Sequence, residues 1–493
     1  MSEQPNILII QADQHRPDCL GAYGNNDIQT PHIDALAQDG VRHDNSFCPY
    51  PVCTPSRYSF LSGLYVRQHL GGSNHCTLPS GLPTFPKELR RAGYRTKAVG
   101  KMHLTPTYHD VGFDQMLLAE QNGAGRYDDD YHRWLQQEGQ THLSDLMDQE
   151  REYRQHAPPE YWDHVGALES DLDEKHHSTT WIAEQALEEL ATWQEGGQLL
   201  MVSFIKPHHP FDPPAPWSRM YNPDALSLLP GYTPAPLPQD LDFSPGYFPN
   251  SEMTEAKIRR AMAFYYATIS QIDHHVGRMV KSLQERALYD DTIIIYNSDH
   301  GDYMGYHHLL LKGNYMYEPL IKVPLIIKFP HQERAGAASQ NLVNSIDLAP
   351  TLLRQADCPV PATMQGLDLA DPAADRDAIF AESGRGQAFM ARTHEHKLLL
   401  CRRDQQSQFF DLQADPHELT NRYAEAACQG EIDQLRRRLT DWALFDAAAP
   451  VHVDEDAPLI TGPNVRHPDD GQREDLYDYF NHRVHQHLQK PEQ

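Results

Sequence analysis

The run NILIIQA at residues 6–12 decides the fold class, because it is an almost unbroken apolar stretch that ends directly before Asp13-Gln14. Strands with few polar positions are buried on both faces, which is typical of a parallel sheet covered by helices. Four further runs repeat the pattern: YRTKAVG at residues 94–100, QLLMVSFI at 198–205, TIIIYNS at 292–298 and VPLIIKF at 323–329. The sequence therefore predicts an α/β fold with a large, mainly parallel sheet flanked by helices.

Helical patterns lie between these strands. Thr30-Pro31 predicts a helix start and Gly40 its end, and a second helix is predicted at residues 83–92. The longest pattern spans residues 251–288, where apolar side chains recur every three or four positions: Ile258, Met262, Tyr265, Ile269, Ile272, Val276, Met279 and Leu283. A coiled coil would show the same stripe, but the strand that follows favours a crossover helix packed on the sheet.

The sequence pattern changes after about residue 370, from long apolar runs to short strand-like pieces. We expect a large domain over residues 1–370, with insertions at about 105–175 and 212–250 that form the rim of a binding site rather than core elements. Residues 371–493 are expected to form a smaller α+β subdomain with an antiparallel sheet, followed by a weakly patterned tail at 454–493. Its strand-like pieces lie at 378–382, 389–392, 397–402 and 408–412, before a helical pattern at 431–444.

The charge balance limits the partners of the protein. The 493 residues include 42 Lys and Arg against 69 Asp and Glu, a formal net charge of −27, while 40% are hydrophobic. This composition disfavours disorder, and the acidic excess argues against nucleic acid or an anionic membrane as a partner. An anionic ligand would need a local group of cations.

Location is predicted from what the sequence lacks. No run approaches the roughly eighteen apolar residues of a membrane helix, and MSEQPNILIIQAD has neither a basic start nor a signal cleavage site. The 7 cysteines have irregular spacing, which does not resemble a disulfide framework. We therefore expect a cytoplasmic protein without disulfides or membrane spans.

Chemically useful residues follow four of the predicted strands. Because the carboxyl ends of parallel strands meet at one edge, where ligands of open α/β sheets bind, we expect these residues to lie together. Two aspartates with an imidazole and an amide predict a divalent-metal site, although an Asp at a strand end is often only a loop cap. The four groups are Asp13-Gln14, Lys101-Met102-His103, the KPHHP stretch at 206–210 and Asp299-His300.

The stretch CTPSR at residues 53–57 adds an anion site. Thr54 is the expected N-cap of a helix and Pro55 its first residue. The helix start and the Arg57 guanidinium would together favour a tetrahedral oxyanion. Cys53 could also be a small buried apolar residue, or part of a zinc site with Cys48.

Residues 53–57, followed by Leu61-Ser62-Gly63, resemble the C-x-P-S-R signature of the formylglycine-dependent sulfatases in the alkaline-phosphatase-like superfamily. The resemblance covers about residues 5–330, and a weaker similarity occurs in FFDLQADPHELTN at 409–421. Other blocks similar to the family occur in the family's order: NILIIQADQHRPDCLGAYG, GYRTKAVGKMHL, SFIKPHHPFDPP, SDHGDYMG and KGNYMYEPLIKVPLII.

The resemblance implies an alkaline-phosphatase-like fold and hydrolysis of a sulfate monoester, carried by a small molecule or an oligosaccharide, with a carbohydrate or aryl alcohol expected. A maturation enzyme would oxidise Cys53 to formylglycine. One oxygen of its hydrate would attack sulfur in line, and the second hydroxyl would then lose its proton so that the intermediate collapses and releases sulfate.

The resemblance also implies a role for each site residue. Arg57 would hold the aldehyde hydrate, Lys101 and Lys312 would neutralise the sulfate oxygens, and His103 would act as the base. His208 would bind sulfate and protonate the leaving oxygen. The cation is expected to be Ca²⁺, with Mn²⁺ or Mg²⁺ as alternatives, and its implied ligands are Asp13, Gln14, modified Cys53, Asp299 and His300.

The chain departs from the family at two of these positions. Many members have Asp where this chain has Gln14, and Asn where it has His300. Variants with Gln and His also occur in relatives that act on choline sulfate or phosphonate monoesters. Four nearby residues are expected to lie outside the machinery: His209, Asp302, His307 and His308.

Three other functions remain open on the sequence. The first is a phosphonate or phosphate ester hydrolase on the same scaffold. The second is a two-zinc phosphatase with Thr54 as nucleophile, and the third is a binding module for sulfated glycans without catalysis. An oligomer is also left open.

Overall fold

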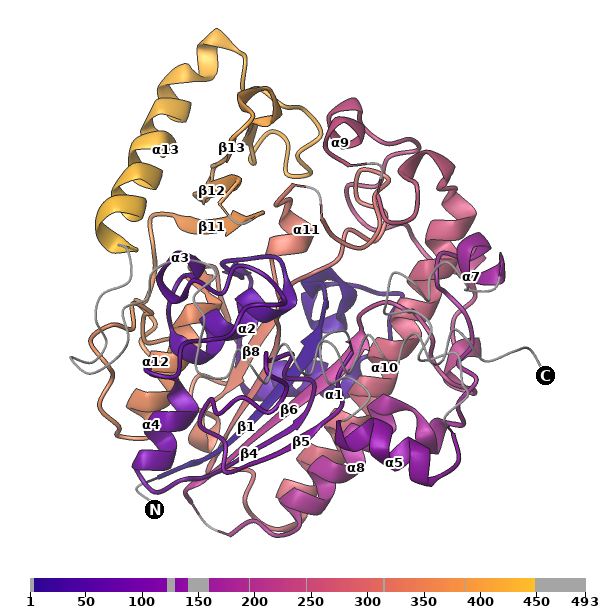
Figure 1. Cartoon of the computed structure of the whole chain (residues 1–493), viewed down its shortest axis with the longest axis vertical. Coiled ribbons are helices and arrows are strands. Elements are labelled where there is room, and N and C mark those ends of the chain that lie inside the picture. The colour runs from indigo at the N-terminus through magenta and orange to yellow at the C-terminus, as the bar shows by residue number, and fades with distance from the viewer. Residues whose placement is uncertain are drawn as a thin grey trace.

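The computed structural model describes residues 4–121, 129–140, 159–194, 196–244, 246–313, 315–384 and 386–447, and the expected tail at 454–493 lies outside them. An eight-stranded sheet in the order β5-β4-β6-β1-β7-β8-β2-β9 crosses the larger part of the molecule (Figure 1). Its strands are β1 (Asn6–Asp13), β2 (Val41–His43), β4 (Arg95–Gly100), β5 (Gln115–Leu118), β6 (Gln198–Pro207), β7 (Thr292–Ser298), β8 (Leu325–Lys328) and β9 (Ala337–Ser339). The α/β fold with a large, mainly parallel sheet expected from the sequence is confirmed.

Five neighbouring strands of this sheet run parallel. In the centre, β1 pairs with β6 on one side and β7 on the other, with Ala12 opposite Phe204 and Ser298. Because the three strands run in the same direction, the residues that follow them meet at one edge. The fifth predicted run forms β8, which is antiparallel to β7, since the connection from β7 contains only the short helix α11 (Glu318–Ile321) and no long crossover helix.

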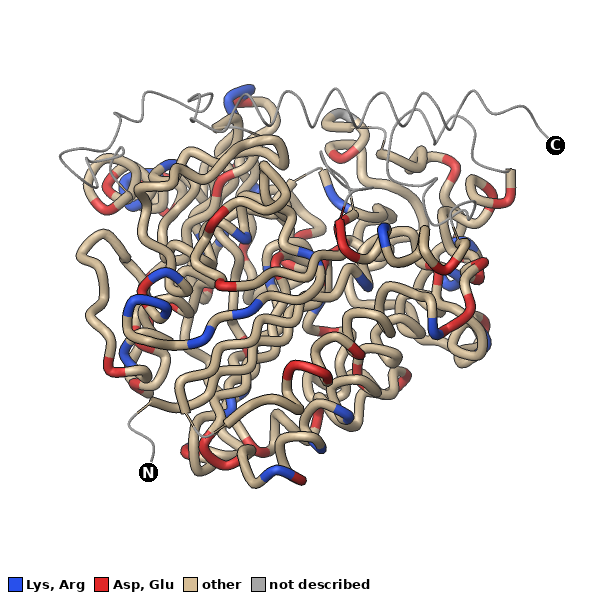
Figure 2. The backbone as a smooth tube through the Cα atoms, turned by 60° about the horizontal axis from the view of Figure 1, so that its bottom comes forward, with Lys and Arg blue, Asp and Glu red and all other residues tan. Residues whose placement is uncertain are grey.

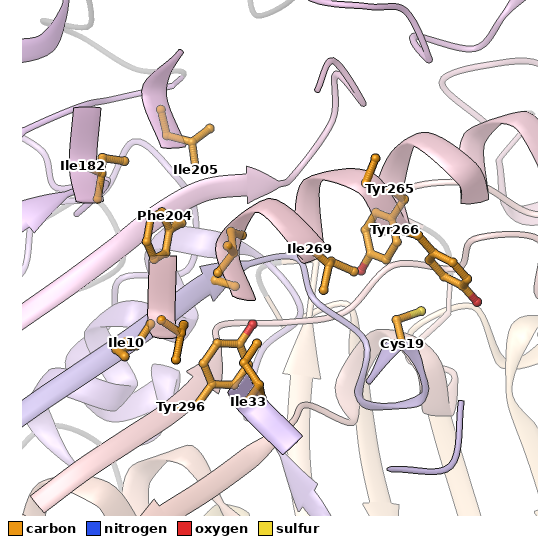
Figure 3. Close-up of a cluster of buried hydrophobic side chains, with 14 of the residues drawn as sticks. Ile10, Cys19, Ile33, Ile182, Phe204, Ile205, Tyr265, Tyr266, Ile269 and Tyr296 are labelled. Carbon is orange, nitrogen blue, oxygen red and sulfur yellow. The ribbon is translucent and has the colours of Figure 1, made fainter. Parts of the chain in front are cut away.

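Helices cover both faces of the sheet. On one face lie α1 (Pro31–Asp39), α8 (Ser178–Leu190) and α10 (Glu255–Glu285), and Figure 3 shows Tyr265 and Ile269 of α10 over Ile10 and Tyr296 of the sheet. The eight apolar residues predicted as a stripe on this helix are all buried. On the other face lie α2 (Cys53–Ser62), α4 (Phe85–Arg91) and α12 (Leu348–Gln355).

The C-terminal part contains the predicted antiparallel sheet, in the order β11-β12-β13-β14. Its strands are β11 (Ile379–Ser383), β12 (Ala388–Arg392), β13 (His396–Cys401) and β14 (Gln408–Asp411), and α13 (Gln429–Asp441) follows them. The exact boundary near residue 370 stays a prediction. The remaining elements are β3 (Ser46–Phe47), β10 (Val343–Asn344), α3 (Val66–His69), α5 (Asp130–Gln137), α7 (Pro159–Asp163) and α9 (Pro238–Phe243).

Two local predictions are wrong. The 105–175 segment is not only rim, because β5 pairs with β4 in the main sheet and its Leu118 is buried in the core. Helix α2 begins at Cys53 rather than after Thr54, since the extended Val52 caps it and the amide of Ser56 donates to the Val52 carbonyl. The Thr54 hydroxyl, which would have capped the helix, donates instead to the carbonyl of His103.

All seven cysteines lie in the described part of the chain, and each is free. Within the described residues, no helix combines the length and apolar character needed to cross a membrane.

Candidate active site

Four predicted site residues converge beyond the ends of β1 and β7. The side-chain ligand atoms of Asp13, Cys53, Asp299 and His300 all lie within 4.8 Å of one another, and all four residues are buried. Among the described residues this is the only group of three or more His, Cys, Asp or Glu side chains that meets in this way. Cys48 belongs to no such group among the described residues, so the structure does not support a zinc site with Cys48.

Two cations hold the carboxylates in place. The Arg57 guanidinium lies 2.9 Å from an oxygen of Asp13 and 2.9 Å from an oxygen of Asp299. It also donates to the carbonyl of Lys101 at 2.6 Å and to the hydroxyl of Ser203 at 2.8 Å. Lys101 Nζ lies 2.8 Å from the same Asp13 oxygen that Arg57 contacts. The guanidinium therefore connects α2 to the ends of β1, β4 and β7.

The charges in this group shift one another's pKa values. Burial and the neighbouring Cys53 oppose ionisation of Asp13, but Lys101, His208 and Arg57 hold its pKa well below the ordinary value. Burial and the charge of Asp13 raise the pKa of Asp299. Burial would also raise the pKa of the Cys53 thiol, but Lys312, Lys101 and His300 lower it well below the ordinary value. Position 53 is therefore an electropositive point between two carboxylates.

Lys312 reaches this point from the loop after β7. Its ammonium lies 3.3 Å from Cys53 Sγ, 3.1 Å from His300 Nε2 and 2.9 Å from Gln14 Oε1. All three atoms present lone pairs to a positive charge. The loop thus adds a third cation to the site, beside Arg57 and Lys101.

Backbone carbonyls fix two of the imidazoles. His300 Nδ1 lies 2.9 Å from the carbonyl oxygen of Gly301, and His208 Nδ1 lies 2.5 Å from that of His209. Because a carbonyl only accepts, each Nδ1 carries the proton and each Nε2 is free to face the site. Burial lowers the pKa of His208 to about 3, and the charges of Lys312 and Lys101 act in the same direction.

His103 lies at the end of the β4 loop with a left-handed backbone, φ 55°. Burial lowers the pKa of its imidazole to about 4, while its interaction with Cys53 partly offsets the shift. The imidazole is therefore neutral at pH 7 and able to accept a proton.

The arrangement combines a nucleophile position, a cluster of oxygen and nitrogen ligands, and three cations in a buried space. Acidic and basic positions are interspersed elsewhere on the described chain (Figure 2), so the positive group at Cys53 is a local exception to the net charge of −27. Such a site is suited to a negatively charged tetrahedral group.

The family model described as "Sulfatase" matches residues 5–358, which is more than half of the chain. The chain belongs to the sulfatase family. A second model, described as "N-sulphoglucosamine sulphohydrolase, C-terminal", matches residues 305–444. As a member of this family, the sulfatase is a sulfuric ester hydrolase, and the reading as a binding module without catalysis is not supported.

Named relatives cover most of the sulfatase. An arylsulfatase of Clostridium perfringens is 29% identical over 479 residues, 88% of this chain and 94% of the relative. A choline-sulfatase of Rhizobium meliloti is 29% identical over 483 residues, 90% of this chain and 88% of the relative. The solved phosphonate monoester hydrolase of Agrobacterium radiobacter superposes with a TM-score of 0.73 at 25% identity, covering 88% of this chain and 96% of that one.

Two residues of the sulfatase site were missed or misjudged from the sequence. The Glu120 carboxylate is buried and accepts hydrogen bonds from the backbone amides of Met102 and His103, each at 2.9 Å. Burial raises its pKa to about 7. Asp302 was expected outside the machinery, yet it accepts a hydrogen bond of 2.5 Å from Gln14 Nε2. No spacing or motif in the sequence signalled either contact.

The other three residues expected outside the machinery make contacts elsewhere. His209 Nε2 pairs with the Tyr161 hydroxyl at 3.2 Å. His307 Nε2 lies 2.7 Å from the carbonyl of His417, and His308 Nδ1 lies 2.9 Å from that of Thr233. These partners belong to the packing around the sulfatase site.

Proposed function

We propose that this sulfatase hydrolyses a sulfate monoester with formylglycine, formed from Cys53, as the nucleophile. The observation that carries the proposal is the surroundings of the Cys53 sulfur, which stands for the formylglycine oxygens. It lies 3.2 Å from His300 Nε2, 3.3 Å from Lys312 Nζ and 3.8 Å from Asp13 Oδ1. A residue in this position is next to both a metal-ligand set and the cations that an anionic ester needs.

The residues present fit a divalent cation. Two carboxylates and one imidazole, from Asp13, Asp299 and His300, surround position 53 in a buried cluster. The amide oxygen of Gln14 faces Lys312, whose ammonium contacts both position 53 and His300. Oxygen donors suit Ca²⁺, Mg²⁺ or Mn²⁺, and the imidazole suits Mn²⁺ better than Ca²⁺. The proposed ion is Ca²⁺, with Mn²⁺ and Mg²⁺ as alternatives. When bound, the cation supplies positive charge that favours ionisation of the attacking hydroxyl.

The three cations of the site have different roles. Arg57 pairs with both Asp13 and Asp299, so it orients these side chains and position 53. Lys101 and Lys312 both lower the pKa of the group at position 53, and their ammonium groups would contact the oxygens of the sulfate. In a buried site such contacts act without competition from water, which strengthens them as negative charge develops.

The two imidazoles suit different steps. His103 is neutral at pH 7, so it would take the proton from the second hydroxyl when sulfate is eliminated. The His208 side chain interacts with that of Cys53, and burial, with Lys312 and Lys101, lowers its pKa. A bound sulfate ester would offset these positive charges, raise the pKa of His208 and allow it to protonate the leaving alcohol.

The substrate class follows from the relatives rather than from the pocket. The names arylsulfatase, choline-sulfatase and N-acetylglucosamine-6-O-sulfatase belong to proteins that match about nine tenths of this chain. We propose an aryl or carbohydrate sulfate, small or oligosaccharide, as the substrate. We also propose that a formylglycine-generating enzyme acts on the chain and that it works in the cytoplasm.

Mass spectrometry tests the nucleophile. Trypsin would release residues 43–57, a peptide that carries both Cys48 and Cys53. From protein made together with a maturation enzyme, we expect an aldehyde at position 53 and an alkylatable thiol at Cys48, which serves as an internal control. Active protein with both thiols intact would contradict the proposal.

A second candidate function is hydrolysis of a phosphonate monoester. It is favoured by the similarity to the phosphonate monoester hydrolase, and by the presence in one chain of Gln at position 14 and His at position 300. Comparing kcat/KM for matched aryl sulfate and aryl phosphonate esters separates the two. We expect the sulfate ester to be preferred, and preference for the phosphorus ester would reverse the ranking.

A further inference from the structure

The Gln14 side chain is held in one orientation by groups on both sides. Its Nε2 donates to Asp302 Oδ2 at 2.5 Å, and its Oε1 accepts from Lys312 Nζ at 2.9 Å. An ammonium group can only donate, so the amide oxygen must face Lys312 and the amide nitrogen must face Asp302. Both Gln14 and Asp302 are buried, so water does not compete for the bond between them.

The Gln14 backbone is also fixed. Its amide donates to Asp299 Oδ1 at 3.1 Å, and its carbonyl accepts from the Tyr265 hydroxyl at 2.6 Å. The residue has φ 63°, in the left-handed region that a non-glycine residue adopts only when its surroundings hold it there. Main chain and side chain are therefore both determined by neighbours.

Asp302 cannot rotate to release the amide. Its Oδ1 accepts from the backbone amides of Met304 at 2.7 Å and Leu311 at 3.1 Å. These two bonds occupy one carboxylate oxygen, and the other oxygen is left to face Gln14. The loop that carries His300 and Lys312 thus also carries an acceptor aimed at the amide.

We infer that Asp302 is a positioning residue, which turns the Gln14 amide so that its oxygen faces the Asp13, Asp299 and His300 cluster and serves as a ligand for the divalent cation. The inference rests on the proposed function, because it concerns the cation of that site. It also gives a reason for a neutral ligand beside Asp13, since the negative charge lies one hydrogen bond further out, on Asp302.

Replacement of the acceptor by an amide should reverse this orientation. In Asp302→Asn, the two backbone amides of Met304 and Leu311 still require an oxygen at the Oδ1 position. The new NH₂ group would then face Gln14 and donate to it, so the Gln14 amide would turn and present its own NH₂ to the cation. Loss of one oriented ligand typically weakens metal binding about 10- to 100-fold.

A second substitution should repair the first. In Gln14→Glu, both oxygens of the new carboxylate are acceptors. In the Asp302→Asn background, one of them can therefore accept from the new NH₂ group and the other can bind the cation. Gln14→Glu alone would place two carboxylates against each other, which is unfavourable in a buried site. The two substitutions are therefore expected to compensate one another.

The test is a Mn²⁺ titration of EDTA-treated full-length protein at pH 8, in which electron paramagnetic resonance and calorimetry measure binding. We expect Asp302→Asn to raise the Kd for Mn²⁺ at least about 10-fold and the double variant to return close to the wild-type value. Asp273→Asn is the matched control, because one oxygen of that buried carboxylate accepts from the amides of His32 and Ile33, an oxygen that the substitution keeps. Its Kd should not change.

Three results overturn the inference or the function beneath it. Wild-type binding by folded Asp302→Asn would overturn the role of Asp302. If that variant does not fold, Gln14→Met decides, since wild-type binding without an amide would show that Gln14 is not a ligand. Wild-type protein that binds neither Mn²⁺ nor Ca²⁺ would overturn the metal site of the proposed function itself, which is a different outcome.

Discussion

Lys101 Nζ lies 2.8 Å from Asp13 Oδ2, and neither side chain is exposed to solvent. The pair joins the ends of two strands of the central sheet, β4 and β1, which are separated by β6. A lysine and an aspartate buried together cost much of their hydration, so the pair serves the site more than it stabilises the fold. The same carboxylate oxygen also contacts Arg57, which places two cations on one oxygen.

Lys101→Met should therefore reduce both activity and stability. One buried cation would be lost beside Asp13, and we expect the free energy of unfolding to fall by about 3 kcal/mol. We also expect kcat/KM for a sulfate ester to fall about 100- to 1,000-fold, as for other groups that stabilise developing charge. Urea unfolding and steady-state kinetics measure the two effects.

Lys97→Met is the matched control, because Lys97 lies on β4, the strand that Lys101 directly follows, and pairs at 2.7 Å with Glu189 in a partly exposed position. It should change the free energy of unfolding by less than about 1 kcal/mol and leave kcat/KM unchanged. An equal loss of kcat/KM in the Lys101→Met and Lys97→Met variants would show that Lys101 has only a structural role.

Substitutions at positions 53 and 54 separate the two proposed nucleophiles. Cys53→Ala should lower kcat more than about 1,000-fold, because no other group replaces an absent nucleophile. Thr54→Val should lower it no more than about 10-fold, since the variant loses only one hydrogen bond to the backbone. That bond joins the Thr54 hydroxyl to the His103 carbonyl at 2.8 Å. Retained turnover in Cys53→Ala would favour the phosphatase alternative.

The sheet and most of the site were predictable because they depend on strand ends. The apolar runs gave the strands, and parallel pairing of β1 with β6 and β7 brings Asp13, His208 and Asp299 to one edge without further information. The start of α2 was predicted two residues too late, since Thr54 and Pro55 fit a capping pattern that Val52 fulfils by its extended backbone.

The contributions of Glu120 and Asp302 were not predictable from spacing. Glu120 follows β5, a strand of four residues with no alternation of polar and apolar positions, in a segment whose polar composition resembled an insertion. Its contacts with the amides of Met102 and His103 depend on the path of a loop, which a hydrophobic pattern does not encode. The contact of Asp302 with Gln14 depends in the same way on the path of the loop after β7.

Removal of the metal should destabilise the protein. Asp13, Asp299 and the group at position 53 would then face each other with only Arg57, Lys101 and Lys312 as counter-charges. We expect EDTA to abolish turnover and lower Tm, and Ca²⁺ or Mn²⁺ at about 100 times its Kd to restore about 2.7 kcal/mol of stability. Differential scanning calorimetry measures the change. In Asp299→Asn the response of Tm to metal should be much smaller, and an unchanged response would place the cation elsewhere.

His69 should make the protein sensitive to acid. Its Nδ1 accepts from the amide of Gly71 at 3.1 Å, so Nε2 carries the proton and pairs with the Ser59 hydroxyl at 2.9 Å. Burial lowers the pKa of this imidazole to about 3 in the folded protein. Below the ordinary pKa of about 6.5, the unfolded chain therefore binds a proton that the folded chain does not, and the free energy of unfolding falls as the pH falls.

His69→Gln should remove this part of the pH dependence. Between pH 7 and pH 5, a single imidazole shifted this far contributes about 2 kcal/mol to the loss of stability. We expect the wild-type protein to lose that much more than the variant over this interval, measured as free energies of unfolding in urea at both pH values. His394→Gln, at an exposed turn, is the control and should show the wild-type slope. If His69→Gln also shows the wild-type slope, the imidazole is protonated in the folded protein, and its hydrogen bond with Gly71 is not the one that determines its state.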